Sequence, residues 1–162
     1  MITETKIDDH VKSASLSVNG YLLNRQDRTA HGGGVATYVS SGLALSVLTL
    51  EQEKAAKAGP EVTINLITKP GNRQDLVVVG VCKPPAARAE WFEAFADILL
   101  QLIPQGQLVI MGDLNADLMR RRVQPGKALR EALALAGTNV HSTANTRITA
   151  ETATCIDVIA LD

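Results

Sequence analysis

A carboxylate and a carboxamide stand two residues apart directly after a short apolar run. Residues 108–111 (Leu-Val-Ile-Met) lead into Gly112, Asp113, Leu114 and Asn115. A short apolar run that ends in turn-forming residues is typical of a buried strand, and side chains at positions i and i+2 of an extended segment point to the same side. We therefore expect Asp113 and Asn115 to project together from a strand end, where open α/β folds place their ligand sites.

Two interpretations of this pair are open. In the first, the carboxylate of Asp113 holds a metal ion or activates water, and the amide of Asn115 donates to a phosphate oxygen. In the second, the two residues form a polar turn that closes the strand, with Asn115 stabilising the turn. The spacing alone favours neither interpretation.

A second acidic residue, Asp157, lies in the middle of the apolar run 154–161. Burying an ionised carboxylate without partners is costly, so a core strand that contains one needs a reason to keep it. One reason is structural, with Asp157 paired to a cation such as Arg147 or to backbone donors. The other is functional, with Asp157 contributing to a metal site or orienting a histidine. We favour the functional reason, because acids inside apolar strands are rare and Asp113 supplies a second acid at a strand end.

The candidate metal ligands in the sequence are oxygen donors. His10, His31 and His141 are scattered and there is no CxxC pair, which argues against zinc. Carboxylates without such a cluster favour Mg²⁺ or Mn²⁺, and sites of this kind usually serve phosphate-ester hydrolysis. Residues 120–122 are three arginines that follow the Asp113 motif. They could contact a phosphate backbone, but a solvated loop is slightly favoured.

The apolar pattern predicts the elements that must position these side chains. Strands are predicted at residues 35–39, 43–50, 62–68, 76–82 and 154–161, with a further strand that carries Asp113. Helices are predicted at residues 87–102 and 127–136, with Gly137 as the stop of the second. Residues 1–31 show weak periodicity. Residues 51–60 are predicted to form an exposed connection, and residues 69–72 a hairpin turn. Adjacent hairpins with helices outside them predict a layered α/β domain.

Several conspicuous residues are predicted to be structural. Residues 32–34 are three glycines before a strand, and since no Lys-Ser/Thr pair or helical pattern follows, a tight backbone approach is favoured over a phosphate cradle. Trp91 and the two phenylalanines follow the helical core pattern, which favours burial over base stacking. Cys82 and Cys155 each lie in an apolar run, which predicts two buried thiols in a reducing compartment.

Length and composition bound the class of protein. A chain of 162 residues with 46% hydrophobic and 20% charged residues fits one soluble globular domain with a sizeable core. A formal net charge of −1 argues against a strongly basic nucleic-acid carrier, although an enzyme with a local basic rim is compatible with it. No segment has the apolar length of a membrane span or of a signal peptide, so we expect an intracellular protein, nuclear or cytoplasmic, with no membrane partner.

Taken together, five blocks in order resemble the endonuclease/exonuclease/phosphatase superfamily. More narrowly, they are similar to the endonuclease domain of non-LTR retrotransposon (jockey-like) reverse-transcriptase proteins. The resemblance spans nearly the whole chain. The blocks are residues 3–7 (family "ETW"), 24–29 with 32–36 ("R-x-D-R…GGGVA"), 80–85 ("GVYRPP"), 111–117 ("GDFN-x-D") and 146–149 with 155–159 ("TRIT…LIDVI").

The resemblance implies a DNA-nicking phosphodiesterase that uses Mg²⁺ or Mn²⁺. Glu4 would hold the metal and Asp113 would activate or position the attacking water. Asn115 would bind the scissile phosphate and Asp157 would orient the catalytic histidine. The implied fold is a deoxyribonuclease-I-like α/β sandwich of two sheets with helices on both outer faces.

Three departures from the family pattern matter. The family's first strand with its catalytic Asn and its closing Ser-Asp-His block are not in the sequence, and Cys82 replaces the Tyr of "GVYRPP". We therefore expect residues 1–162 to be a single domain, truncated at both ends and missing terminal strands, with little or no activity. The resemblance implies a DNA partner and fusion to a reverse transcriptase in a longer polyprotein.

Two other functions remain open. A non-catalytic remnant would act as a nucleic-acid or protein binding module. A phosphatase acting on small phosphoesters or lipids would also belong to the superfamily, but the "R-x-D-R…GGGVA" and "TRIT" blocks favour the retrotransposon branch.

Overall fold

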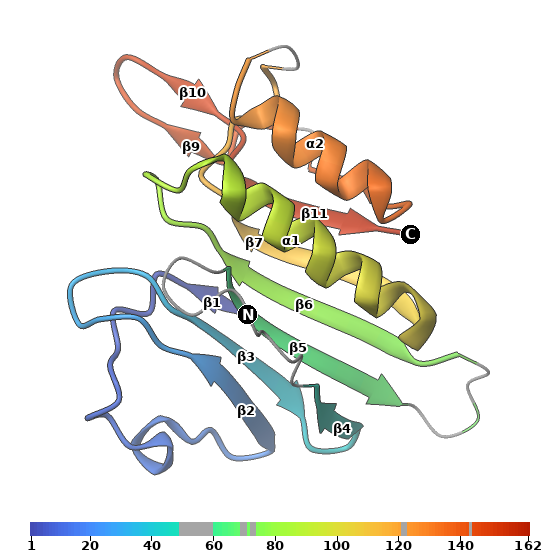
Figure 1. The fold of residues 1–162 in the computed structure, drawn as a ribbon. Coiled ribbons are helices and arrows are strands. Elements are labelled where there is room, and N and C mark those ends of the chain that lie inside the picture. The colour runs from blue at the N-terminus through green and yellow to red at the C-terminus, as the bar shows by residue number, and fades with distance from the viewer. Residues whose placement is uncertain (49–59, 69–70, 72–73, 121–122, 143) are drawn as a thin grey trace.

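Two stacked β-sheets with helices on one side form the body of the protein, and a separate two-stranded sheet lies beside them (Figure 1). The computed structural model describes residues 1–48, 60–68, 71, 74–120, 123–142 and 144–162. The larger sheet has six strands, and each pair of neighbours is antiparallel except β6 and β7. Their order is β4 (Ala44–Val47), β5 (Glu61–Thr68), β6 (Leu76–Cys82), β7 (Gln107–Asp113), β11 (Asp157–Leu161) and β8 (Asn139–Val140).

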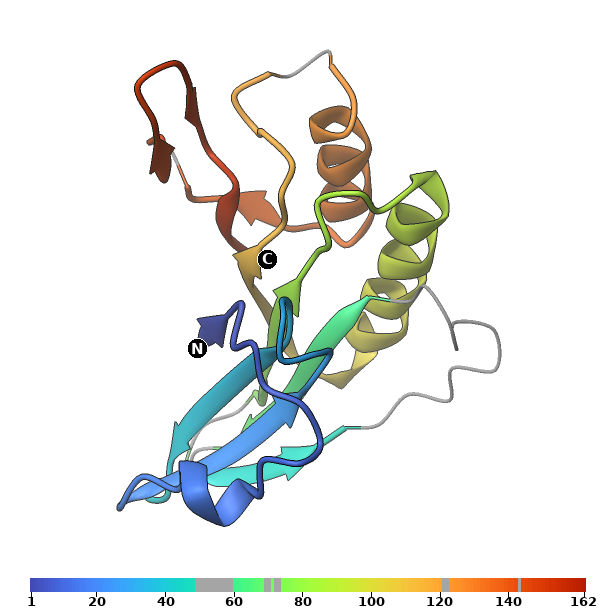
Figure 2. The same ribbon diagram turned by 90° about the vertical axis from the view of Figure 1, so that its left-hand side faces the viewer.

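The parallel step from β6 to β7 requires a crossover, which helix α1 (Ala89–Leu102) and the short 3₁₀ turn η2 (Ile103–Gln105) provide. Helix α2 (Gly126–Leu135) lies beside α1 on the same face of the large sheet (Figure 2). It ends before Gly137, whose φ of 71° is the left-handed conformation typical of a helix stop. Both predicted helices are thus confirmed within two residues.

The main core lies between these helices and the large sheet. Alternate residues of the central strands point toward the helices, and the aromatic residues of α1 cover them. Trp91, Phe92 and Phe95 are at most 6% exposed, so their predicted core role is confirmed. The strand residues that face the helices are Val77, Val79, Val81, Leu108, Ile110, Val158 and Ala160.

The smaller sheet covers the other face of β5 and β6. It has the order β1 (Ile2–Thr3), β3 (Val35–Ser40), β2 (Tyr21–Gln26). Polar contacts join the sheets: the hydroxyls of Thr37 and Thr63 are 2.8 Å apart, and Asn24 Nδ2 donates to Asn65 Oδ1 at 2.9 Å and to the Ile64 carbonyl at 3.4 Å. Buried polar groups need such partners, so the two sheets meet in one defined alignment.

The outer face of the smaller sheet carries no α-helix among the described residues. The segment before β2 crosses it instead, including the 3₁₀ turn η1 (Ser13–Leu16), whose Leu16 carbonyl accepts a hydrogen bond from the Tyr38 hydroxyl at 2.8 Å. The helices implied for both outer faces are therefore found on one of them, the outer face of the larger sheet.

Residues 1–31, whose weak periodicity predicted no particular element, contain β1 and β2. One sequence-based expectation was wrong. The run 154–161 is not one buried strand, because β10 (Ala153–Thr154) pairs with β9 (Arg147–Ile148) in a separate hairpin before β11 begins at Asp157 (Figure 1). The other strands are confirmed with shifted ends, although the predicted strand 43–50, the connection 51–60 and the turn 69–72 fall partly or mostly outside the described residues.

Candidate active site

One row of four residues crosses the larger sheet in register. Glu61 of β5 is the partner of Cys82 of β6, Cys82 is the partner of Asp113 of β7, and Asp113 is the partner of Asp157 of β11. Register partners in a sheet present their side chains on the same face. That face is opposite the helices, because Val81 and Val158, which flank row members along the chain, point into the helix-side core. The row therefore gathers three acids and a thiol at one end of the sandwich.

Asp113 and Asn115 meet as predicted, but in a turn. Strand β7 ends at Asp113, and Asn115 has a φ of 43°, so the expected extended segment through Asn115 was wrong. The Asn115 N–H donates to Asp113 Oδ1 at 3.0 Å, which is an Asx turn closed by the aspartate. Asn115 Nδ2 donates to the Lys83 carbonyl at 2.9 Å. The polar turn of the second interpretation is therefore present, while the metal, water and phosphate roles of the first stay predictions.

Asp157 is exposed, which corrects the expectation of a buried carboxylate in a core strand. Since β11 starts at Asp157, alternation sends Val158 and Ala160 into the core and Asp157 to the opposite face. The smaller sheet lies over β5 and β6 and leaves that part of the face uncovered. No ion pair joins Asp157 to Arg147 within the part of the chain that the structure describes. Asp157 is thus an exposed carboxylate in register with Asp113.

Glu4 reaches the row from the smaller sheet's side. Glu4 directly follows β1 and has a φ of 52°. Its Oε2 accepts a hydrogen bond from the Gly33 N–H at 2.8 Å. The Cys82 thiol donates to Glu4 Oε1 at 3.5 Å. The turn of glycines thus anchors one carboxylate oxygen of Glu4, while the other lies against the row.

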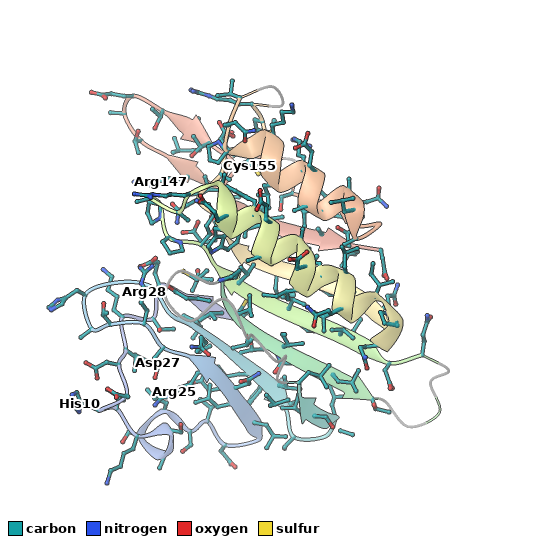
Figure 3. All side chains as sticks on the ribbon, viewed as in Figure 1. His10, Arg25, Asp27, Arg28, Arg147 and Cys155 are labelled. Carbon is teal, nitrogen blue, oxygen red and sulfur yellow. The ribbon has the colours of Figure 1, made fainter. Side chains whose placement is uncertain are left out.

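Arg28 lies between two carboxylates. Its Nη1 is 3.0 Å from Glu61 Oε1, and its Nη2 is 3.8 Å from Glu4 Oε1. A Cβ on Gly33 would lie 2.1 Å from Arg28 Nε, so the guanidinium packs directly on the glycine turn. The predicted tight backbone approach at residues 32–34 is confirmed, and its purpose is to admit this side chain. Arg28 lies on the same side of the molecule as Arg147 of β9 (Figure 3).

Lys83 links the end of β6 to the site through its backbone. Its N–H donates to the Asp113 carbonyl at 2.8 Å, and its own carbonyl accepts the Asn115 amide. The side chain is fully buried, with Nζ donating to the Pro84 carbonyl at 3.0 Å and lying 5.4 Å from the centre of the Phe92 ring. Burial lowers the pKa of this ammonium, and the charge of Asp113 opposes that effect.

Burial and the neighbouring acids raise the pKa of two groups in the row, Asp113 and Cys82. Burial is the main cause of the raised pKa of Asp113, and the charges of Asp157 and Glu4 add to it, while the Asn115 N–H and Arg147 oppose it. Burial also raises the pKa of the Cys82 thiol to about 12, with Glu4 and Glu61 adding to the effect. Both cysteines are free and buried, as predicted.

Comparison with known families identifies the chain. A model of the endonuclease/exonuclease/phosphatase family matches residues 1–159. The chain belongs to this family. The resemblance inferred from the ordered motifs is thereby confirmed, and the mixed α/β sandwich agrees with the family fold.

Solved structures show the same family fold. The chain is similar to the endonuclease domain of TRAS1, a telomere-specific non-LTR retrotransposon, with a TM-score of 0.62, 17% identity and coverage of 89% of this chain and 68% of that one. It is similar to the 3′ phosphatase NExo from Neisseria, bound there to a product DNA hairpin, with a TM-score of 0.61, 16% identity and coverage of 99% and 74%. A truncated TDP2 from Caenorhabditis elegans gives a TM-score of 0.59, 12% identity and coverage of 99% and 69%. No curated protein matches the sequence.

Enzymes of this family generally use divalent metals, so the fit of the residues to a hard cation matters. Among the described residues no three His, Cys, Asp or Glu side chains converge closely enough to enclose a metal ion. Mg²⁺ does not need such a cage, because proteins often hold it with one or two carboxylates, water and substrate phosphate. Glu4 Oε1, at the row and 3.5 Å from the Cys82 thiol, fits that chemistry.

Sequence reasoning assigned no role to Glu61 or to Arg28, although Arg28 lies in the block at residues 24–29. Glu61 is the first residue of β5. No other candidate site residue lies near it in the sequence, so no motif spacing indicated a role for it. Of the arginines at 120–122, Arg120 is exposed and pairs with Asp117 at 3.4 Å, and the other two fall outside the described residues. Asp117 also accepts the Cys155 N–H at 3.2 Å, which ties the Asp113 loop to the segment before β11.

Proposed function

We propose that residues 1–162 belong to a Mg²⁺-dependent phosphodiesterase that nicks DNA, the endonuclease domain of a retrotransposon polyprotein with a reverse transcriptase. The observation that carries the proposal is the pair Asp113 and Asp157 in direct register, with Asn115 bonded to Asp113. Similarity in fold to the TRAS1 endonuclease domain and to a 3′ phosphatase bound to a DNA hairpin supports DNA as the substrate class.

The proposed roles follow from the contacts. Glu4 would hold Mg²⁺ (or Mn²⁺) through Oε1, since Oε2 is occupied by the Gly33 N–H. The cation, when bound, would offset negative charge that develops on the phosphate. Asp113 would position and deprotonate the attacking water, and its raised pKa brings it closer to the range in which a carboxylate is an effective base.

Asn115 would contact the phosphate with its side-chain amide. An amide carries two N–H donors, and one of them donates to the Lys83 carbonyl, which fixes the direction of the other. Asp157 would orient a catalytic histidine, as in the family pattern. His10, His31 and His141 are all exposed, and none hydrogen bonds to Asp113 or Asp157 among the described residues. We therefore propose little or no nicking by residues 1–162 alone.

Plasmid nicking tests the proposal. A chain extended at both termini should convert supercoiled plasmid to open circles with Mg²⁺, and Asp113→Ala should abolish the reaction. Residues 1–162 should give little product under the same conditions. Failure of the extended chain to nick would overturn the proposed activity, and robust Asp113-dependent nicking by residues 1–162 would contradict the proposed weakness.

A second candidate function is a non-catalytic binding module. The exposure of His10, His31 and His141, which leaves Asp157 without a histidine partner among the described residues, favours it. It predicts DNA binding without Mg²⁺ that survives Asp113→Ala and Glu4→Ala. With a formal net charge of −1, that binding should be weak and fall steeply with salt.

A further inference from the structure

Glu61 has no role in the proposed chemistry, yet it belongs to the same row as Asp113 and Asp157. Its side chain is 11% exposed, and both of its oxygens are used. Oε2 accepts the Gly34 N–H at 2.8 Å, and Oε1 lies 3.0 Å from Arg28 Nη1. A carboxylate buried this far is retained for a partner, and the partner here is the Arg28 guanidinium.

Arg28 poses a problem for any cation bound at Glu4. A guanidinium is always charged, and it forms forked pairs with carboxylates. If Arg28 paired fully with Glu4, it would neutralise the carboxylate that is proposed to hold Mg²⁺. In the structure it does not, because its contact with Glu4 Oε1 is 3.8 Å, against 3.0 Å with Glu61.

The guanidinium is held in this position from other sides as well. Arg28 Nε donates to the Gly32 carbonyl at 2.9 Å, and the group packs against Gly33. Glu61 therefore draws the charge of Arg28 toward β5, and the glycine turn limits its movement back. Two carboxylates share one guanidinium, which leaves one negative charge uncompensated, on Glu4.

We propose that Glu61 is a positioning residue that keeps Glu4 available to a divalent cation by holding the Arg28 guanidinium away from it. The inference rests on the proposed function, in which Glu4 holds the metal. It assigns to Glu61 an effect on cation affinity that passes through Arg28, with no contact between Glu61 and the cation.

Mn²⁺ binding to residues 1–162, followed by the electron paramagnetic resonance signal of free Mn²⁺, tests this without any turnover. Glu61→Gln keeps an oxygen for the Gly34 N–H but removes the charge, so Arg28 should move to Glu4. Mn²⁺ affinity should then fall about tenfold, as for other residues that orient a metal ligand. Glu131→Gln, which removes a carboxylate from an exposed pair with Lys127, is the matched control and should leave the affinity unchanged.

The double variant Arg28→Met/Glu61→Gln separates this role from a structural one. Without the guanidinium, Glu4 has no competing cation, so Mn²⁺ affinity should return to within about twofold of the wild type. A double variant that binds as weakly as Glu61→Gln would overturn the inference, because Glu61 would then act as a ligand or as a fold element. Glu61→Gln that binds Mn²⁺ like the wild type would also overturn it.

Arg28→Met alone provides a test if Glu61→Gln does not fold, which thermal melting in EDTA would reveal. This variant should bind Mn²⁺ at least as tightly as the wild type, and weaker binding would overturn the inference. Glu4→Gln tests the proposed metal ligand independently of Glu61. If wild-type binding is the same in Glu4→Gln, the proposed metal ligand is wrong and the role of Glu61 falls with it. If binding depends on Glu4 but not on Glu61, the role of Glu61 alone is wrong.

Discussion

Asp113 and Asp157 stand at directly opposed positions on the antiparallel neighbours β7 and β11. Two carboxylates placed this way repel each other, and the charge of Asp157 contributes to the raised pKa of Asp113, after the larger effect of burial. A protein that keeps such a pair at a strand end keeps an unfavourable interaction that folding alone does not require.

Replacing Asp157 with Asn should lower the pKa of Asp113, because one of the charges that oppose its ionisation is removed. Burial remains, so the pKa should stay above that of an ordinary aspartate. Titration of the Asp113 carboxyl carbon by NMR measures the change. Asp97→Asn, at an exposed position on α1, is the control. An Asp113 pKa that is the same in Asp157→Asn and in the wild type would show that the two carboxylates do not interact.

Replacing Asp113 with Asn should stabilise the protein at neutral pH. A carboxyl whose pKa is raised in the folded state stabilises the fold below its unfolded pKa of about 4 and loses that contribution as the pH rises through the folded pKa. The ionised group therefore costs stability at pH 7, and an amide that does not titrate removes the cost. Thermal melts should show a higher Tm for Asp113→Asn at pH 7 and a smaller difference below pH ~4. A gain that stays constant with pH would exclude ionisation as its cause.

Gly33→Ala should destabilise the protein more than Gly20→Ala. Both glycines have φ near 80° (79° and 82°), so alanine is strained at each by about 1–2 kcal/mol. A Cβ at Gly20 meets nothing within 4 Å, but at Gly33 it would collide with Arg28 and displace the guanidinium. Urea denaturation of both variants gives the difference. Equal losses would mean that Arg28 is not held against the glycine turn.

The two thiols should be slow to react in the native protein. Cys82 and Cys155 are buried, burial raises the pKa of both, and the pKa of Cys82 reaches about 12. Since the thiolate is the reactive form, a disulfide reagent at pH 8 should modify neither thiol quickly, and both should react at once in denaturant. Absorbance of the thiolate that a chromogenic disulfide reagent releases measures the reaction. Fast release from the native protein would contradict the burial of these side chains.

Hydrophobic pattern predicted the elements that contribute most to the core. It recovered α1, α2, β3, β5, β6 and β7, because each is a helix with a regular apolar stripe or a short, mostly buried apolar run. It failed for β2 (Tyr21–Gln26), whose residues are exposed or half-buried and whose inward side chains are partly polar, such as Asn24. It also failed at residues 154–161, where an apolar run continues across a break between two sheets.

The site was predictable only in part, for a physical reason. Asp113 and Asn115 are two residues apart in the sequence, so their spacing alone indicated a candidate site. Glu4 and Asp157 were grouped with them through the resemblance of the ordered motifs to the family. Glu61 and Cys82 lie beside them through strand register, a long-range consequence of the fold that local spacing does not record.

The polar contacts between the two sheets, Thr37 with Thr63 and Asn24 with Asn65, have a mechanical consequence. Hydrophobic contact is non-directional and would let one sheet slide over the other at little cost, whereas a slide of one residue breaks both hydrogen bonds. Glu4 belongs to one sheet's side of the sandwich and Asp113 to the other, so the width of the gap between them depends on that alignment. The distance between Glu4 and Asp113 thus depends on four side chains in the middle of the sandwich.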